Sequence, residues 1–226
     1  MFRPTDEPME RGWVGRLDGD EVVHLAAQTL QHLFTGGGAA REHARYALSD
    51  VELLVPLQPP PSVRVFDDDG AFEFANPASV LGPGAVVGHP TGTPLVADIG
   101  VAGLVGPADV VAVSPVVRLR APALRPPKDR DFAIVLGPWF TTMDEAPASS
   151  ALTVAIDGTT HGGATRGTDW ATAAGYAGAN TRLRVGDLLV AAPSMVADVP
   201  AGSTTTVAIE GHGRLSFTVA TDRAGG

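Results

Sequence analysis

The sequence predicts an α+β fold that is mostly β, with many short strands joined by turns. Strand-like segments outnumber helical ones along the 226 residues. Glycine and proline number 27 and 19, as expected where turns are frequent. The clearest hairpin signal lies near the C-terminus, where Thr204 to Glu210 and Arg214 to Ala220 alternate with period two around Gly211-His212-Gly213.

Residues 1–58 are expected to form a small N-terminal subdomain. A turn at Asp18-Gly19-Asp20 separates two strand-like pieces, residues 13–17 and 21–23, which predicts a hairpin. Apolar residues then recur at helical spacing from Val23 to Phe34, and three glycines follow, so a helix is expected there. Ala39 to Leu48 predicts a second short helix, and the alternation of residues 51–55 predicts a strand.

Residues 59–226 are expected to form the second, larger domain, because Pro59-Pro60-Pro61 is the best candidate boundary. A short helix is expected from Asp169 to Tyr176. The remaining predicted strands are Ser62 to Phe66, Ala71 to Phe74, Leu95 to Val105, Val110 to Leu119, Phe132 to Leu136 and Leu152 to Ile156.

Charge and composition exclude several classes of function. The formal net charge is -9 and there is no basic run, so the chain lacks the charge pattern for binding nucleic acid or an anionic membrane surface. It has no cysteine, which excludes disulfides and a thiolate nucleophile. The polar N-terminus does not read as a signal peptide, and no apolar run has transmembrane length. We therefore expect a cytoplasmic protein whose partner is a small-molecule substrate.

Several segments resemble signatures of the fumarylacetoacetate hydrolase family, and they occur in the family's order over roughly residues 10–220. Each segment is weak alone, but their collinear order is fairly specific. They are the hairpin with Asp18-Gly19-Asp20, Pro60-Pro61-Ser62-Val63-Arg64, Phe72-Glu73-Phe74-Ala75-Asn76-Pro77 with Gly82-Pro83-Gly84, Gly137-Pro138-Trp139 with Asp144-Glu145, Val185 to Leu189, and Val207 to Leu215.

The resemblance implies a mixed β-roll with a small N-terminal subdomain, usually a homodimer. Family members cleave C–C bonds, decarboxylate, hydrate or isomerise substrates that carry a 2-oxo-acid or 1,3-dicarbonyl group. A Mg²⁺ ion held by carboxylates chelates the substrate oxygens and stabilises the enolate that forms.

The family's metal ligands have poor counterparts in this sequence. Alignment places Asp98 and Gly100 on the Glu-x-Glu pair, Pro115 on a further aspartate, and Val65 on a fourth position. Only Asp98 of these four offers a carboxylate. The lid with its water-activating His/Glu pair has no counterpart, and Ala192 replaces a threonine that grips substrate carboxylate. We therefore expect no metal and no other cofactor.

Three residues are candidates for catalysis. Lys128 falls on the family's active-site lysine, and a desolvated lysine could stabilise an enolate without metal; the alternative is a solvated loop lysine. Asp98 could be a general base among apolar neighbours, or a hydrogen-bonded acid near Arg118 or Arg120. His89 could move a proton near neutral pH, or have no role. His161 and His212, in glycine-flanked turns, are expected to be exposed.

Three further residues are candidates for substrate binding. In the resemblance, Arg64 sits at the pocket mouth and could hold an anionic or oxo group; a surface salt bridge is the alternative. Pro115 and Ala192 would line a pocket made more apolar by the replacement of carboxylates.

Three hypotheses about function follow. The first is a metal-independent enzyme that isomerises, cyclises or cleaves an enolisable dicarbonyl or polyketide-like molecule. The second is a non-catalytic binding or assembly protein that kept the fold. The third is a Mg²⁺-dependent hydrolase or decarboxylase with an atypical site.

Overall fold

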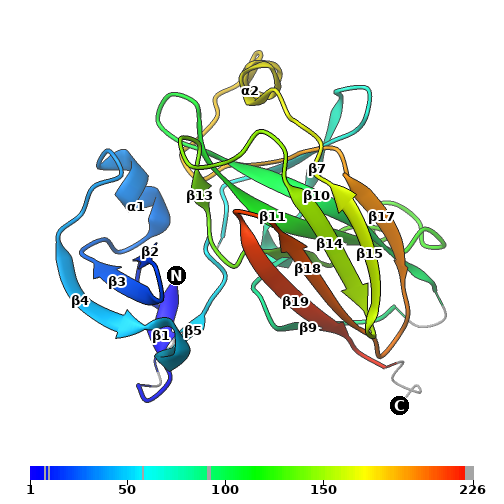
Figure 1. The fold of residues 1–226 in the computed structure, drawn as a ribbon. Coiled ribbons are helices and arrows are strands. Elements are labelled where there is room, and N and C mark those ends of the chain that lie inside the picture. The colour runs from blue at the N-terminus through cyan, green and yellow to red at the C-terminus, as the bar shows by residue number, and fades with distance from the viewer. Residues whose placement is uncertain (8, 10, 58, 91–92, 222–226) are drawn as a thin grey trace.

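A curled sheet of long and short strands forms the body of the protein (Figure 1). The computed structural model describes residues 1–7, 9, 11–57, 59–90 and 93–221. Within those residues the main sheet runs in the order β7-β6-β16-β10-β11-β12-β8, with β13 beside β11 and β17 beside β10. Its strands are β6 (Val63–Phe66), β7 (Phe72–Ala75), β8 (Val80–Leu81), β10 (Leu95–Val105), β11 (Val110–Arg120), β12 (Ile134–Leu136), β13 (Thr141–Thr142), β16 (Leu188–Val190) and β17 (Met195–Val199).

A second sheet packs on one face of the main sheet. It has the order β15-β14-β18-β19-β9, and the core between the two sheets joins Ile99 and Val117 of the main sheet to Val154, Val207 and Phe217 of the second. Its strands are β9 (Ala85–Val87), β14 (Ala151–Ile156), β15 (Thr159–Ala164), β18 (Thr204–Ile209) and β19 (Gly213–Val219). The predicted C-terminal hairpin is confirmed, because β18 and β19 pair antiparallel around the predicted turn.

Helix α2 (Trp170–Gly178), at the top of Figure 1, packs on the same face of the main sheet as the second sheet does. Trp170 and Ala177 pack there against Phe66, Val105 and Leu189. The opposite face of the main sheet carries a separate core that includes Val65, Leu104 and Val116, together with Leu57 from the preceding segment. The site described below lies on this second face.

The N-terminal part carries two small sheets, seen at the left of Figure 1. One pairs β1 (Phe2–Pro4) with β5 (Val51–Leu53), and the other has the order β2-β3-β4, with β2 (Gly15–Asp18), β3 (Glu21–Leu25) and β4 (Glu42–Ala47). The predicted hairpin is confirmed by the antiparallel pairing of β2 with β3. Two short 3₁₀ helices, η1 (Leu48–Asp50) and η2 (Pro77–Ser79), join strands.

Both helices predicted in this part need correction. Helix α1 is only Leu30–Thr35, because Thr29 caps its N-terminus by accepting a hydrogen bond from His32 N, while Val23 belongs to β3. The second predicted helix, Ala39 to Leu48, contains β4 instead. Pairing with β3 overrides its helical spacing, and Arg45 of β4 forms ion pairs back to the β2–β3 hairpin.

Most other predictions of strands and helices agree with the structure. The strand predicted from Leu95 to Val105 is β10, and the helix predicted from Asp169 to Tyr176 is α2, with Asp169 as its N-cap. Among the described residues, no helix is both long and apolar enough to span a bilayer. The fold class, α+β and mostly β, is confirmed.

Candidate functional site

Strands β10 and β11 place the residues that the resemblance singles out on the second face of the main sheet. Side chains two apart on a strand share a face, so Asp98 and Gly100 point the same way, and Arg118 lies directly opposite Asp98. Val190 of β16 pairs with Ala102 of β10 and with Val65 of β6, so the Val65 side chain lies on the same face of the sheet as Ala102. Val65, Asp98 and Gly100 therefore share one surface of the sheet.

Asp98 lies at the centre of an ion-pair network on that surface. Its side chain is only 8% exposed. Arg118 donates from Nε and Nη2 to Oδ2, at 3.3 and 2.9 Å, and Arg120 donates from Nε to Oδ2 at 2.6 Å and from Nη2 to Oδ1 at 2.7 Å. Each of these contacts joins an ionised donor to a carboxylate, the stronger class of hydrogen bond.

Glu73 and Arg130 extend the network to the edge of the sheet. Arg118 Nη1 donates to Glu73 Oε1 at 2.5 Å, and Arg130 Nη1 donates to Glu73 Oε2 at 2.7 Å. Arg130 also donates from Nε and Nη2 to Asp129 Oδ2, at 2.8 and 2.5 Å. Because Glu73 lies on β7 and Arg130 precedes β12, these contacts bridge elements that stand apart in the sheet order.

The network balances its charges, with three guanidinium groups against three carboxylates. Hydrogen bonds to Asp98 raise the pKa of Arg120, and hydrogen bonds to Asp129 and Glu73 raise the pKa of Arg130. The hydrogen bonds from Arg130 lower the pKa of the Asp129 carboxyl below its usual range. Pairing therefore stabilises the charged form of each of these three groups.

A hollow of about 360 Å³ adjoins the network. Glu73 and Arg130 form one side of it, and exposed loop and edge-strand residues form the rest. The other lining residues are Phe74, Ala75, Asn76, Pro126, Pro127 and Asp131. This volume lies at the small end of the range for ligand sites. The hollow thus has an apolar wall of Phe74, Ala75, Pro126 and Pro127, next to the ion pair of Glu73 with Arg130, and Asn76 and Asp131 add polar groups.

The donor set around Asp98 does not fit Mg²⁺, which needs several hard oxygen ligands. Both oxygens of Asp98 already accept hydrogen bonds from guanidinium groups, Gly100 has no side chain and Val65 is apolar. In the described ranges, no group of three or more His, Asp or Glu side chains could hold a metal ion.

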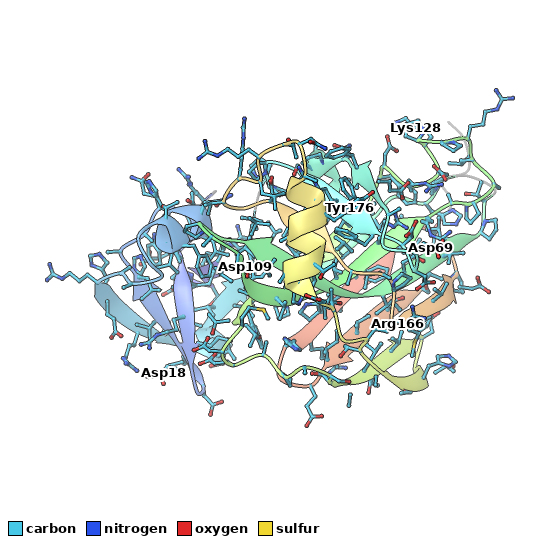
Figure 2. The ribbon with its side chains drawn as sticks, turned by 90° about the horizontal axis from the view of Figure 1, so that it is seen from above. Asp18, Asp69, Asp109, Lys128, Arg166 and Tyr176 are labelled. Carbon is cyan, nitrogen blue, oxygen red and sulfur yellow. The ribbon has the colours of Figure 1, made fainter. Side chains whose placement is uncertain are left out.

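The predicted catalytic residues do not come together. Lys128 lies at the rim of the molecule (Figure 2), with its side chain 76% exposed and paired to Asp131 at 2.8 Å. It is therefore the solvated loop lysine of the alternative interpretation. Asp98 is the hydrogen-bonded acid of the alternative interpretation, since its neighbours are arginines. His89 is a half-buried residue that follows β9. Whether any of the three acts in a reaction stays a prediction.

The predicted binding residues are also scattered. Arg64 is buried rather than at a pocket mouth: its side chain is 5% exposed, and Nη1 donates to Ser62 Oγ at 2.6 Å and to Asp187 Oδ2 at 3.3 Å. Pro115 pairs with Val101, so it lies on the opposite face from Asp98. Neither residue therefore lies on the face that carries Asp98, and their roles in substrate binding stay predictions.

Ala192 lies closer to the predicted site, in the segment between β16 and β17. A Cβ built on Gly100 would be 3.7 Å from Ala192 O, so this segment passes directly beside Gly100. Ala192 also lines a hollow of about 710 Å³, which an ion pair between Arg166 and Asp68 bridges. Figure 2 labels Arg166, Asp69 and Tyr176, which line this hollow.

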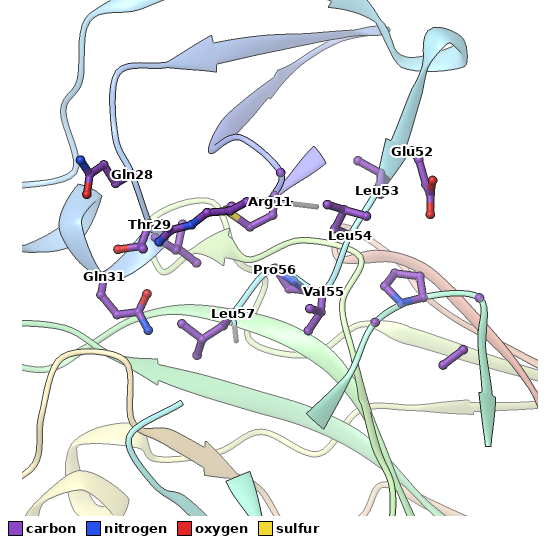
Figure 3. Close-up of a pocket in the computed structure, with 17 residues that line it drawn as sticks. Arg11, Gln28, Thr29, Gln31, Glu52, Leu53, Leu54, Val55, Pro56 and Leu57 are labelled. Atoms are coloured by element: carbon purple, nitrogen blue, oxygen red, sulfur yellow. The ribbon is translucent and has the colours of Figure 1, made fainter. Parts of the chain in front are cut away.

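A further hollow of about 390 Å³ lies between the N-terminal part and residues 82–85, which follow β8 and begin β9 (Figure 3). Arg11, Gln28 and Gln31 contribute polar groups, and residues 53–57 supply much of its apolar wall. It contains none of the predicted site residues.

Sequence reasoning missed Glu73, Arg130 and Asp129. Glu73 was read only as part of a motif, although an acid between two phenylalanines on a strand is a signal, because its side chain must face away from theirs. Arg130 and Asp129 follow Lys128 closely in sequence, but none of the motifs of the resemblance includes them. The pairs that Glu73 makes with Arg118 and Arg130 span 45 and 57 residues, so they could not be read from local sequence.

Comparison with known proteins agrees with the fold. No family sequence model and no curated protein sequence matches the chain. Solved structures do: maleylpyruvate hydrolase from Sphingobium sp. SYK-6 has a TM-score of 0.77 at 19% identity, over 94% of this chain and 97% of that one. 5-Carboxymethyl-2-hydroxymuconate delta-isomerase from Mycobacterium smegmatis has a TM-score of 0.75 at 17% identity, over 93% and 94%.

A third match is the apo form of 2-keto-3-deoxy-D-arabinonate dehydratase, with a TM-score of 0.76 at 16% identity over 92% of this chain and 94% of that one. The hydrolase has also been solved with a manganese(II) ion and pyruvate. At such identities the likeness shows the fold alone, which is that of the fumarylacetoacetate hydrolase-like proteins.

Proposed function

We propose that the protein is an enzyme that acts on an enolisable oxo acid or dicarbonyl molecule, by isomerisation, cyclisation or C–C bond cleavage, without a resident metal ion. The observation that carries this proposal is the network around Asp98. Where the resemblance places carboxylates around a cation, this chain holds the guanidinium groups of Arg118 and Arg120 on a single carboxylate.

Guanidinium groups can supply the electrophile that the reaction class needs. An enolate develops negative charge on oxygen, and fixed positive donors stabilise that charge most where water is excluded. Arg118 suits this role because its side chain is 11% exposed and its orientation is fixed by Asp98. The proposal moves enolate stabilisation from Lys128 to the guanidinium groups, and keeps Asp98 and His89 as predicted proton-transfer groups.

The solved structures of similar fold support the reaction class. Their names describe a hydrolase, an isomerase and a dehydratase of oxo-acid or muconate-type molecules, and one of them holds pyruvate. That structure also holds manganese, so the metal-independent part of the proposal rests on the residues around Asp98 alone.

Exchange of substrate protons into D₂O tests the proposal without knowledge of the natural substrate. Pyruvate and acetylacetone would be incubated with the protein in EDTA, and loss of the exchangeable C–H signals followed by ¹H NMR. We expect protein-dependent exchange that persists in EDTA and falls at least about tenfold in Arg118→Gln, the size of one lost charged contact. Arg16→Gln, at an exposed ion pair, is the matched control.

Two results would refute this function. Exchange that appears only after Mg²⁺ or Mn²⁺ is added would return the conventional metal-dependent hydrolase. Absence of exchange with both probes would leave no support for enolisation. Lys128→Ala and Asp98→Asn in the same assay test the roles predicted for those residues.

The second candidate is a non-catalytic binding or assembly protein. The observation in its favour is that the guanidinium and carboxylate groups of the network satisfy one another, as in a structural core. It predicts ligand or protein binding without proton exchange. The homodimer implied by the resemblance also stays a proposal, which light scattering coupled to gel filtration tests directly.

A further inference from the structure

Glu73 occupies a site that is built for a carboxylate. Each of its two oxygens accepts a hydrogen bond from a different guanidinium group, Oε1 from Arg118 and Oε2 from Arg130. Two guanidinium groups that converge on one carboxylate are a geometry that proteins use to bind organic acids. Here the acid is part of the chain itself.

Both arginines have partners other than Glu73. Arg118 makes two further hydrogen bonds to Asp98, and Arg130 makes two to Asp129. Those two carboxylates are 8% and 9% exposed, which fixes them in the protein. The clamp formed by Arg118 and Arg130 is therefore preorganised by its own buried counter-ions.

Glu73 is the most exposed member of this group, at 40%. It lies on β7, which is the end strand of the sheet path and pairs only with β6 among the described strands. A glutamate side chain with this much solvent contact can turn into water at small cost, since its charge is rehydrated as it leaves. Its departure would leave three guanidinium groups facing two carboxylates, a local charge of +1.

The hollow of about 360 Å³ begins where Glu73 would leave. Glu73 and Arg130 both line it, and Phe74, Pro126 and Pro127 give it apolar walls. A molecule that reached the clamp from this side would place its carboxylate on the guanidinium groups and its body against the apolar residues.

We propose that Arg118 and Arg130 form a binding site for the carboxylate of a small organic acid, and that Glu73 is an internal carboxylate that occupies this site until the acid displaces it. The inference rests on the function proposed above, and specifies how its substrate is held. Glu73 and the ligand exclude one another, so Glu73 weakens the binding of any carboxylate at the site.

Removal of Glu73 tests the competition directly. Isothermal titration with sodium pyruvate at low ionic strength would compare the wild-type protein, Glu73→Ala and Glu42→Ala. Glu42 is a matched control, because it is also a half-exposed strand glutamate paired to arginine. We expect Glu73→Ala to bind pyruvate at least about tenfold more tightly than the other two. Acetone, which lacks the carboxylate, should bind none of them.

A second variant assigns the gain to the clamp. Glu73→Ala combined with Arg130→Gln should lose the tighter binding, because one arm of the clamp is gone. Glu73→Gln keeps the size of the side chain and removes its charge, so it should show a smaller gain and serves if the alanine variant fails to fold.

Equal affinity of the wild-type protein and both Glu73 variants for pyruvate would overturn the inference, as would a gain that survives Arg130→Gln. The outcome is separable from that of the proton-exchange assay. Tighter binding by Glu73→Ala without proton exchange would uphold the clamp and refute the enzyme. Proton exchange that is equal in the wild-type protein and Glu73→Ala would uphold the enzyme and refute the clamp.

Discussion

Replacing Asp98 by asparagine removes the negative charge on which two guanidinium groups converge. Asp98 accepts four hydrogen bonds from Arg118 and Arg120, and its side chain is 8% exposed. Breaking a buried ion pair by removing one partner costs about 3–5 kcal/mol, because the other charge is left without compensation.

The structure places the expected cost at the low end of that range. Arg118 keeps its contact with Glu73, and Arg120, at 29% exposure, can turn partly into water. We therefore expect Asp98→Asn to lower the free energy of unfolding by about 3 kcal/mol. For a chain of this length, that corresponds to a fall of about 6–12 °C in the melting temperature.

Urea unfolding followed by circular dichroism at pH 7 measures this cost. Arg120→Gln and the double variant complete a mutant cycle, and the double variant should be less unstable than the sum of the two single variants by about 1–3 kcal/mol. Glu42→Gln, at an exposed pair with Arg16, should cost less than about 1 kcal/mol. If Asp98→Asn costs no more than this control, the network is not the buried charge cluster described above.

Three other predictions concern the scaffold. Burial lowers the pKa of His212 below its ordinary 6.5, so the unfolded chain takes up a proton at a higher pH than the folded chain. The free energy of unfolding should therefore fall as the pH drops below 6.5 through the folded pKa, and the fall should be smaller in His212→Asn when urea midpoints are compared across pH. A fall of the same size in the variant would contradict this. Gly103→Ala should lower the free energy of unfolding by about 1–3 kcal/mol and shift the tryptophan fluorescence, because its Cβ would lie 2.8 Å from the Trp170 ring. An unchanged melting temperature would count against that packing. Asp169→Ala removes the N-cap of α2 and should cost about 0.5–2 kcal/mol by thermal melting, unless the helix is held by packing alone.

Local patterns predicted the main strands well because their apolar residues are set by burial. Leu95 to Val105 reads as an apolar run interrupted only by Asp98, and β10 is indeed buried on both faces. The same reasoning failed at Ala39 to Leu48, where nonlocal pairing decides the structure. The β14–β15 hairpin was missed although Asp157-Gly158 is a strong turn signal, since β15 is exposed throughout and lacks an apolar alternation.

The buried histidine shows a related limit. His212 was expected to be exposed, because it lies between two glycines in a hairpin turn. In the structure it is 3% exposed, and its backbone N–H donates to Ile209 O within the turn. The glycines around His212 indicate a turn, but they do not show whether the side chain in that turn faces water or the neighbouring sheets.

The site was only partly predictable, for a physical reason. Arg118 and Arg120 were recognised as possible partners of Asp98, since β10 and β11 are adjacent in sequence and pair antiparallel. Glu73 could not be found in this way. It meets Arg118 across 45 residues and Arg130 across 57, through contacts created by the curl of the sheet. The family's metal-ligand positions align with Val65, Asp98, Gly100 and Pro115, so the alignment gives no signal for Glu73 or Arg130.

The same contacts that suit Arg118 and Arg130 to binding also hold the sheet together. Glu73 joins β7 to β11 and to the loop before β12, so its loss should cost some stability while it opens the clamp. A purely structural role predicts that Glu73→Ala is less stable and binds acids no better. A displaceable carboxylate predicts that Glu73→Ala is less stable in the free state but binds pyruvate more tightly. It also predicts that stability recovers as pyruvate is added, because a ligand that binds only the folded state raises its stability. Melting temperatures of Glu73→Ala measured along a pyruvate titration therefore distinguish a purely structural role of Glu73 from that of a displaceable carboxylate in a binding site.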